Sequence, residues 1–179
     1  MVGRLIQLNA HLRNLAEIDE LTGLANRRKV LADAVNIFAD AVMNNESCAF
    51  AILDLDHFKK INDTFGHEAG DLVLLQVAQQ MQKTTRLVNK LGRYGGEEFI
   101  VIMPNTGKEM ALQEMEDLRH ALEMMQIETS QGIVIPITVS IGVSVISINT
   151  GRYEEILAEA DKALYNAKRE GRNRIKLYA

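Results

Sequence analysis

A short, continuously apolar run from Cys48 to Leu53 constrains the fold of this 179-residue chain most strongly. Six apolar residues without polar alternation are typical of a strand that is buried on both faces of a sheet. The run ends at Asp54-Leu55-Asp56, so two carboxylates follow directly. Because open α/β sheets bind ligands at the ends of their strands, the sequence predicts a central strand with a binding site at its acidic end.

A second acidic site lies at Gly95-Gly96-Glu97-Glu98, between two expected strands, Leu91–Tyr94 and Phe99–Met103. The two glycines predict a two-residue hairpin with positive φ, and they leave the main chain open to a bulky ligand. Two adjacent acids repel each other and bury nothing, which indicates a hard cation or a proton-transfer role. Taken alone, the tetrad is equally well explained as a solvated hairpin.

The two acidic sites together favour a magnesium site. A strand ending in Asp54 and a hairpin carrying Glu97 can converge on one ion. Magnesium takes one or two carboxylates and completes its octahedron with water and substrate phosphates. The sequence contains no Gly-x-Gly-x-x-Gly and no Walker lysine motif, so a nucleotide would have to be held in another way.

The remaining segments predict an α+β fold, an α/β sandwich with a mixed, mainly antiparallel central sheet flanked by helices, and not a parallel Rossmann sheet. Asn26 is the expected N-cap of a helix running to about Met43. Further helices are expected over 57–63, up to Lys83 after a loop at Gly66 and Gly70, along the apolar stripe of Ala111, Met115, Leu118, Leu122 and Met125, and over 156–167. Ile133–Ile148 reads as β-rich with an edge or bend at Pro136, and Arg174–Tyr178 as a closing strand.

Composition excludes several classes of protein. The apolar content of 47% supports a real core, and the net charge of −4 argues against a general nucleic-acid binder. The single cysteine, Cys48, rules out an internal disulfide and fits a reducing cytoplasm. No apolar run approaches the roughly 20 residues that cross a bilayer, and no signal peptide is visible. We therefore expect a cytoplasmic segment without membrane contact, whether or not the larger protein is anchored.

Leucines at the N-terminus follow a heptad pattern, at Leu5, Leu8, Leu12 and Leu15. The pattern covers about two heptads, too few for a stable isolated coiled coil. One interpretation is a helix packed on its own domain. The other is that residues 1–18 are the remnant of a longer signalling helix and that residues 19–179 form the catalytic domain.

Five sequence blocks at matching spacing resemble those of one protein family. The signature block is Arg93–Phe99, which contains the Gly-Gly-Glu-Glu-Phe sequence. The other blocks are Asp19–Arg28, Asp54–Asp63, Phe65–Asp71 and Tyr165–Arg174. Together they resemble the GGDEF family of diguanylate cyclases, with Glu in the third signature position, from about Asp19 to the C-terminus.

The resemblance implies a fold similar to nucleotidyl cyclases and polymerase palms. It also implies condensation of two GTP molecules into cyclic di-GMP with release of two pyrophosphates. Each domain of a homodimer would hold one GTP, and each 3′-hydroxyl would attack the α-phosphate of the other. The implied cofactors are two Mg²⁺ ions per site, with Mn²⁺ as a substitute, and an upstream sensor is expected outside this segment.

The resemblance also assigns the chemistry to particular residues. Asp54 and Glu97 are the expected side-chain metal ligands, with the Leu55 carbonyl as a third oxygen. Glu98 is expected at the site, where it assists the second metal, accepts the 3′-hydroxyl proton or orients the turn. Neighbouring residues of a regular strand face opposite ways, so Glu97 and Glu98 need not serve the same ion.

Asn62 and Asp71 are the implied readers of guanine, whose N1 and N2 donors suit a carboxylate and whose O6 suits an amide. Both residues also fit ordinary helix ends. The implied phosphate-binding residues are Lys59, Lys168 and Arg172. The glycines that would let backbone approach the nucleotide are Gly66, Gly70, Gly95 and Gly96.

The family often carries an inhibitory product site, Arg-x-x-Asp, nine residues before the first signature glycine. Here that place reads Arg86-Leu87-Val88-Asn89. Because an amide lacks the charge of a carboxylate, Asn89 should weaken product binding by about 1–3 kcal/mol.

Alternatives to an active cyclase are a non-catalytic receptor for GTP or cyclic di-GMP, and a pure dimerisation or signalling module. A sister activity using ATP with GTP is a further alternative.

Overall fold

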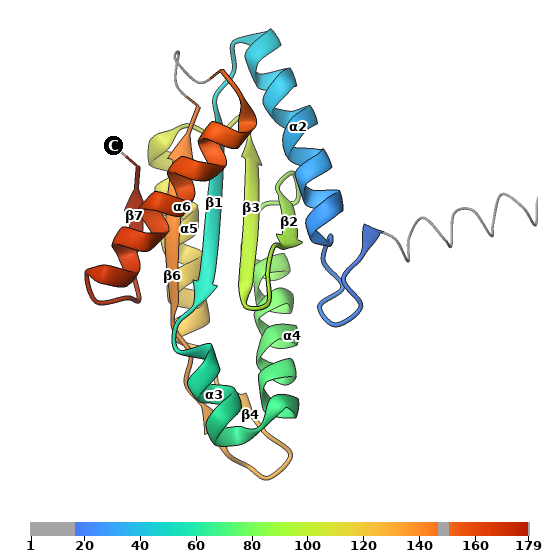
Figure 1. Cartoon of the computed structure of the whole chain (residues 1–179), viewed down its shortest axis with the longest axis vertical. Coiled ribbons are helices and arrows are strands. Elements are labelled where there is room, and N and C mark those ends of the chain that lie inside the picture. The colour runs from blue at the N-terminus through green and yellow to red at the C-terminus, as the bar shows by residue number, and fades with distance from the viewer. Residues whose placement is uncertain (1–16, 147–150, 179) are drawn as a thin grey trace, which may run out of the picture.

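The computed structural model describes residues 17–146 and 151–178. Its centre is a five-stranded sheet in the order β2-β3-β1-β6-β7. The pairs β2–β3, β3–β1 and β1–β6 are antiparallel, and β6–β7 is parallel. The predicted α+β fold with a mixed, mainly antiparallel sheet is therefore confirmed (Figure 1).

Within the described residues, the elements follow the expected order with one unexpected short strand, and the expected β-rich segment Ile133–Ile148 contains two strands. The strands of the central sheet are β1 (Cys48–Leu55), β2 (Lys90–Arg93), β3 (Glu98–Pro104), β6 (Val139–Val145) and β7 (Ile175–Leu177). The helices are α2 (Arg27–Asn44), α3 (Phe58–Phe65), α4 (His67–Thr84), α5 (Lys108–Glu123) and α6 (Tyr153–Arg169). A separate two-stranded sheet pairs β4 (Ile127–Glu128) with β5 (Val134–Ile135).

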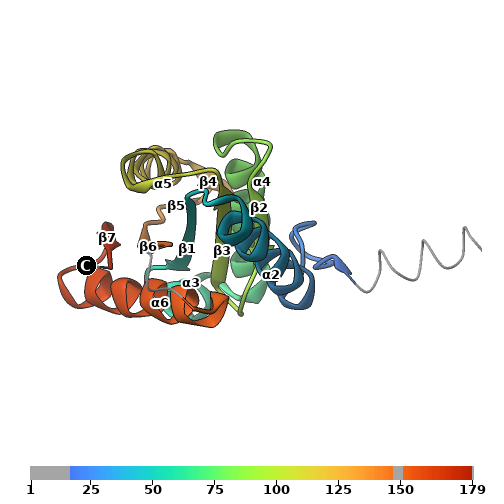
Figure 2. The same cartoon turned by 90° about the horizontal axis from the view of Figure 1, so that it is seen from above.

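Strand β1 is the middle strand of the sheet, and all eight of its residues are buried. Its alternate side chains enter two cores. Ala49, Ala51 and Leu53 pack with residues of α4 and α5, whereas Phe50 and Ile52 pack with residues of α2 and α6. Figure 2 shows α4 and α5 on one face of the sheet and α2 and α6 on the other. Burial on both faces, and not a parallel neighbour, explains the unbroken apolar run.

Two turns depend on residues that the sequence marks. Asn26 caps α2, because its side-chain oxygen accepts a hydrogen bond from the Lys29 amide at 3.0 Å. Gly66 separates α3 from α4 and has a φ of 87°, which residues with a side chain rarely adopt.

The expected loop at Gly70 is wrong, because Gly70 is buried within α4. A Cβ at Gly70 would lie 1.9 Å from Asn62 Oδ1. The absence of a side chain at Gly70 therefore leaves room for the Asn62 side chain on α3 to lie against the backbone of α4.

The expected two-residue hairpin is also wrong. Four residues, 94–97, separate β2 from β3, and the amides of Tyr94 and Gly95 both donate to the Glu98 carbonyl. The glycines with positive φ in the described ranges are Gly23, Gly66, Gly132 and Gly171, so Gly95 and Gly96 do not need that conformation.

The remaining expectations concern the second half of the chain and the N-terminus. Pro136 lies between β5 and β6, as a bend would require. The short strand β4 was not predicted. Ile148 and the leucines at 5, 8, 12 and 15 lie outside the described residues. None of the helices within 17–146 and 151–178 has the length and apolarity to span a bilayer.

Gly142 on β6 tests the packing of α6 on the sheet. An added Cβ would lie 2.1 Å from the Ala160 carbonyl oxygen and 2.2 Å from the Leu164 amide nitrogen. Because both contacts are backbone atoms, Gly142→Ala should lower the free energy of unfolding by about 3 kcal/mol. Chemical denaturation measures this loss. Gly151→Ala, whose Cβ would meet nothing closer than 3.8 Å, should stay within about 0.5 kcal/mol of the parent. Equal stability of the two variants would contradict the close packing.

Candidate functional site

Asp54 and Glu98 are direct neighbours across β1 and β3, and Asp54 is also opposite Ser140 of β6. Directly opposite residues of an antiparallel pair have side chains on the same face of the sheet. Here that face is the one covered by α2 and α6. The Leu55 amide donates to the Glu97 carbonyl at 3.3 Å, which ties the last hairpin residue to the end of β1. The fold thus brings together the two acidic sites, which are more than 40 positions apart.

The three carboxylates form a crowded acidic cluster. Burial is the main cause that raises the pKa of Asp54, Glu97 and Glu98. The charge of Asp54 raises the pKa of both glutamates further. All three groups therefore resist ionisation in the folded protein, and a bound cation would relieve that repulsion.

Lys168 forms an ion pair with this cluster. It stands in the last turn of α6, and its Nζ is 2.7 Å from Asp54 Oδ2. Its ammonium lowers the pKa of Asp54 and so opposes the effect of burial there. The charge of Arg172 lowers the pKa of Asp54 as well, which indicates that Arg172 also acts on the cluster.

Two charged residues near the cluster were missed from the sequence. Arg27, the first residue of α2, lowers the pKa of Glu98, and its guanidinium carbon is 4.7 Å from the centre of the Tyr94 ring. Asp161 on α6 raises the pKa of Glu98. Arg27 lies in the first family block, Asp19–Arg28, but the sequence assigned it no role at the site. Asp161 lies in the middle of α6, where no local sequence pattern marks it.

Arg93 stabilises the turn that carries Glu97 and links it to Asp19. Its Nη2 donates to the Gly96 carbonyl at 2.8 Å, and its Nη1 is 3.2 Å from Asp19 Oδ1. Thr22 donates two hydrogen bonds to Asp19 from its amide and hydroxyl, which lower the pKa of Asp19 against the opposing effect of burial. The first sequence block therefore supports the signature turn.

The two signature glycines differ in what surrounds them. A Cβ at Gly95 would lie 2.4 Å from Glu98 Oε2, so the Glu98 carboxylate lies close over Gly95. A Cβ at Gly96 would meet nothing within 4 Å. The space in front of Gly96 is therefore open to a ligand.

The expected guanine readers lie next to each other at the junction of α3 and α4. Asn62 reaches the α4 backbone at Gly70, and Asp71 is the next residue on that helix. Asn62 is half-buried and Asp71 is exposed. Lys59 is exposed on α3, two residues after His57, where the chain turns from β1 into this helix.

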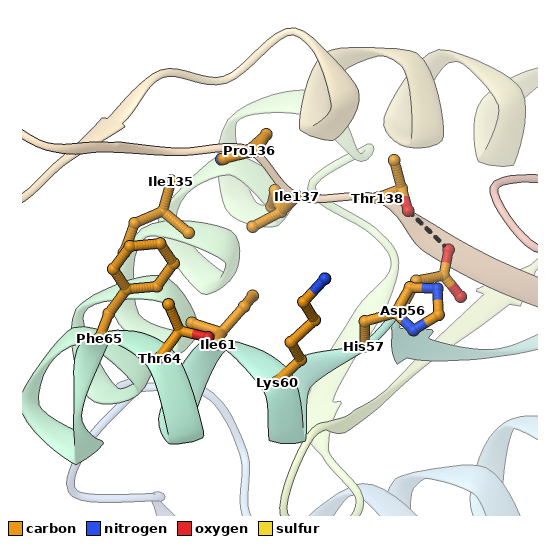
Figure 3. A pocket seen from close by; sticks show the side chains of 10 residues that line it. All are labelled: Asp56, His57, Lys60, Ile61, Thr64, Phe65, Ile135, Pro136, Ile137 and Thr138. Atoms are coloured by element: carbon orange, nitrogen blue, oxygen red, sulfur yellow. Dashed lines mark hydrogen bonds between the residues drawn. The ribbon is translucent and has the colours of Figure 1, made fainter.

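Asp56 is buried at the end of β1, but its carboxylate is engaged differently from that of Asp54. It accepts hydrogen bonds from the hydroxyls of Thr138 and Ser140 at 2.8 and 2.7 Å and from the Asn173 amide at 3.0 Å. Figure 3 shows the Thr138 bond at one end of a cavity of about 450 Å³ between α3 and segment 135–138. With three donors on its two oxygens, Asp56 has a structural role at the sheet end.

The acidic cluster suits a magnesium ion by its donor chemistry. Within the described ranges, no three His, Cys, Asp or Glu side chains are arranged as a complete metal site. Asp54 and Glu97 with a backbone carbonyl supply fewer oxygens than a protein-only cage. Magnesium keeps several waters and binds through one or two carboxylates plus substrate phosphates, so the residues present fit that ion.

Arg86 and Asn89 lie away from the cluster and are both held by Glu114 of α5. Arg86 Nε is 2.9 Å from Glu114 Oε2, and the Arg86 amide donates to Glu114 Oε1 at 3.0 Å. The Asn89 side-chain amide donates to the same carboxylate, and Arg86 also donates to the Thr106 hydroxyl. The Glu114 side chain is only 10% exposed. Arg86, Asn89 and Glu114 thus form a clamp between the end of α4 and α5.

Comparison with known proteins identifies the family. The family model for the diguanylate cyclase GGDEF domain matches residues 16–174. The chain is 38% identical over 92% of its length to the response regulator PleD of Caulobacter vibrioides. It is 35% identical over 98% of its length to the probable diguanylate cyclase DgcC of Escherichia coli. It spans 37% and 47% of the lengths of these two relatives.

Solved structures agree with this result. The coiled coil and GGDEF domain of DgcB from Caulobacter crescentus, solved with c-di-GMP, has a TM-score of 0.94 at 32% identity. The alignment covers 98% of this chain and 93% of the solved DgcB chain. The active GGEEF domain of a diguanylate cyclase from Vibrio cholerae has a TM-score of 0.82 at 37% identity, covering 87% and 98% of the two chains. The chain therefore belongs to the GGDEF family of diguanylate cyclase domains.

Proposed function

We propose that this domain condenses two GTP molecules into cyclic di-GMP with release of two pyrophosphates. The observation that carries the proposal is the cluster of Asp54, Glu97 and Glu98 at the end of β1, in a chain with an intact family signature. A receptor or signalling module would not require three mutually repelling carboxylates beside two cationic side chains. Repulsion of this kind is typical of catalytic sites.

Diguanylate cyclases of the GGDEF family depend on a metal ion. Here we propose two Mg²⁺ ions, with Mn²⁺ as a substitute, held by Asp54, Glu97 and the Leu55 carbonyl. When bound, the ions would neutralise the triphosphate and favour ionisation of the attacking hydroxyl. Glu98 faces Asp54 across the two strands, and its raised pKa suits it to accept the 3′-hydroxyl proton.

Lys168, Arg172 and Lys59 are proposed to hold the triphosphate. Lys168 can exchange its contact with Asp54 for a phosphate oxygen, because its ammonium is a point charge on a flexible chain. Gly95 and Gly96 allow the phosphates to approach the turn, and Gly96 faces open space. The three cationic side chains would neutralise negative charge on the phosphate oxygens. The α-phosphorus, at which the new bond forms, would then be attacked more easily.

Asn62 and Asp71 are proposed to select guanine. Their adjacency at the α3–α4 junction lets one amide and one carboxylate meet the O6 and the N1 and N2 hydrogens of the same base. Adenine would leave those groups unpaired.

Because each domain holds one nucleotide, the reaction requires a second domain facing the first, and we propose a homodimer.

Asp54→Asn tests the catalytic proposal. Removing the charge while keeping the shape should lower the rate of cyclic di-GMP formation from GTP and magnesium at least about 100-fold. Mass spectrometry identifies and quantifies the product. Asp40→Asn is the matched control, because Asp40 is exposed on α2, and it should keep the parent rate. Saturable GTP binding without any product from the parent protein would favour a non-catalytic receptor, and a lack of both would favour a signalling module.

Glu97→Gln separates activity from stability. Because burial and neighbouring charges raise the pKa of Glu97, its ionised form destabilises the fold above the ordinary carboxyl pKa of 4.5. The neutral glutamine should therefore raise the free energy of unfolding by about 0.2–1 kcal/mol at pH 7 while activity falls. The gain should vanish below pH 4, where the glutamate is protonated in both states. Urea unfolding at the two pH values measures it, and a loss of stability at pH 7 would contradict the charge crowding.

Product feedback through Arg86 and Asn89 is proposed to be weak. Asn89 supplies no carboxylate, and Glu114 already neutralises the Arg86 guanidinium from within the chain. A nucleotide would have to displace that ion pair before it could bind the arginine. The pair joins a nearly buried carboxylate to a half-exposed arginine, so its contribution to the fold exceeds that of an exposed pair.

Arg86→Ala should consequently reduce stability and leave product inhibition nearly unchanged. We expect a loss of about 1–3 kcal/mol in the free energy of unfolding, because Glu114 loses its partner. Affinity for cyclic di-GMP, measured by calorimetry, should change by less than about twofold. Arg152→Ala, which breaks an exposed pair with Glu154, is the control and should cost less than about 0.5 kcal/mol. Tight product binding that is lost in Arg86→Ala would show a working inhibitory site.

A further inference from the structure

The turn between α6 and β7 has an unusual backbone. Gly171, Arg172 and Asn173 are three successive residues with positive φ, at 115°, 65° and 47°. The Arg172 amide closes the helix by donating to the Ala167 carbonyl at 3.0 Å. Glycine and asparagine adopt this conformation readily, but arginine does not. The surroundings must therefore hold Arg172 in place.

Asn173 provides the connection to those surroundings. Its backbone amide donates to Asp56 Oδ2 at 3.0 Å. Its side-chain oxygen accepts from Arg119 Nη1 at 2.7 Å, and its side-chain nitrogen donates to Glu123 Oε1 at 2.7 Å. One residue thus joins the turn to the end of β1 and to α5.

Two of the partners of Asn173, Asp56 and Arg119, are themselves held by further contacts. Asp56 is buried and receives the hydroxyls of Thr138 and Ser140, as Figure 3 shows for Thr138. The Arg119 side chain is 12% exposed and is held on α5 by Glu116 and Glu123 at 2.7 and 2.8 Å. A rigid set of hydrogen bonds therefore sets the direction in which the chain leaves Arg172.

From this arrangement we infer that Asn173 is a positioning residue that holds Arg172 toward the triphosphate of the bound nucleotide. The inference rests on the proposed function, which gives Arg172 a phosphate to bind. Independent support is geometric: Asn173 binds Asp56, which is two residues after Asp54, and Lys168, four residues before Arg172, reaches Asp54 at 2.7 Å. The turn that carries Arg172 therefore lies beside the acidic cluster. The side-chain oxygen and nitrogen of Asn173 both bind protein groups, so Asn173 need not touch the substrate.

A double-mutant cycle between Asn173 and Arg172 tests the inference. The measured quantity is the affinity for a GTP analogue with a methylene group between the α- and β-phosphorus atoms, which cannot be cyclised, in the presence of magnesium. Asn173→Ala should weaken binding about fivefold to tenfold, and Arg172→Ala about tenfold. In the Arg172→Ala background, the added Asn173→Ala should weaken binding by less than about twofold, because the group it positions is gone.

Two further variants keep the test decisive if Asn173→Ala folds poorly. Asn173→Gly keeps the positive φ but loses the side-chain bonds, and Arg119→Met removes one anchor. Both should weaken binding in the parent and not in the Arg172→Ala background. Gln113→Ala removes an exposed amide hydrogen bond to Asp117 on the same helix and should bind like the parent. Thermal unfolding of every variant confirms that each protein is folded.

The outcomes separate this inference from the proposed function. Equal weakening with and without Arg172, or parent-like binding by Asn173→Gly, overturns the positioning role. If the parent protein still makes cyclic di-GMP, either result leaves the proposed function standing. A parent protein that neither binds the analogue nor makes the product overturns both.

Discussion

Two carboxylates directly opposite each other on neighbouring strands are the constraint on which this site depends. Asp54 and Glu98 are register partners, and like charges in that position destabilise a sheet. The strands cannot slide apart, because β1 is buried along its whole length between two layers of helices. The repulsion is therefore retained in the folded protein and is offset in part by Lys168. A divalent cation would balance such an arrangement of charges, and the proposed polyphosphate would bind through that cation.

Asp54 and Asp56 are two residues apart in the same strand segment, and their environments give them different roles. Asp56 is saturated by two hydroxyls and one amide, so it stabilises the end of the sheet and the α6–β7 turn. Burial raises the pKa of Asp54, and its one ion-pair partner within the described ranges is a flexible lysine. A carboxylate whose partner can move away remains available to a ligand, whereas one fixed by three donors does not.

The sequence predicted those features that depend on local pattern. The apolar run of β1, the stripe of α5 and the Asn26 cap each have a periodic or chemical signal within a few residues. The roles of the glycines were harder to predict. Gly70 is inside a helix because of Asn62, and the Gly95 Cβ position is filled by Glu98, so the reason for each glycine lies in a tertiary contact. The two-residue strand β4 is too short for periodicity to reveal it.

Long-range contacts explain the rest of what sequence reasoning missed at the site. Asn173 and Asp56 are 117 positions apart, and Arg93 and Asp19 are 74 apart. Their residue types are common at turns, so neither pair stands out in the sequence. The acids were predictable because two of them are adjacent and a third ends an apolar strand. The groups that hold the site in shape are dispersed over the chain, and only the fold brings them together.

The placement of Lys168 shows how a packing detail reaches the chemistry. Helix α6 lies so close to β6 at Gly142 that a Cβ there would meet the backbone at Ala160 and Leu164. Lys168 is one helical turn beyond Leu164 and therefore lies on the same side of α6. A larger residue at position 142 would push this side of the helix away from the sheet, and the Lys168 ammonium would withdraw from Asp54 with it. The close approach of α6 to β6 thus sets how far the cation reaches over the acidic cluster.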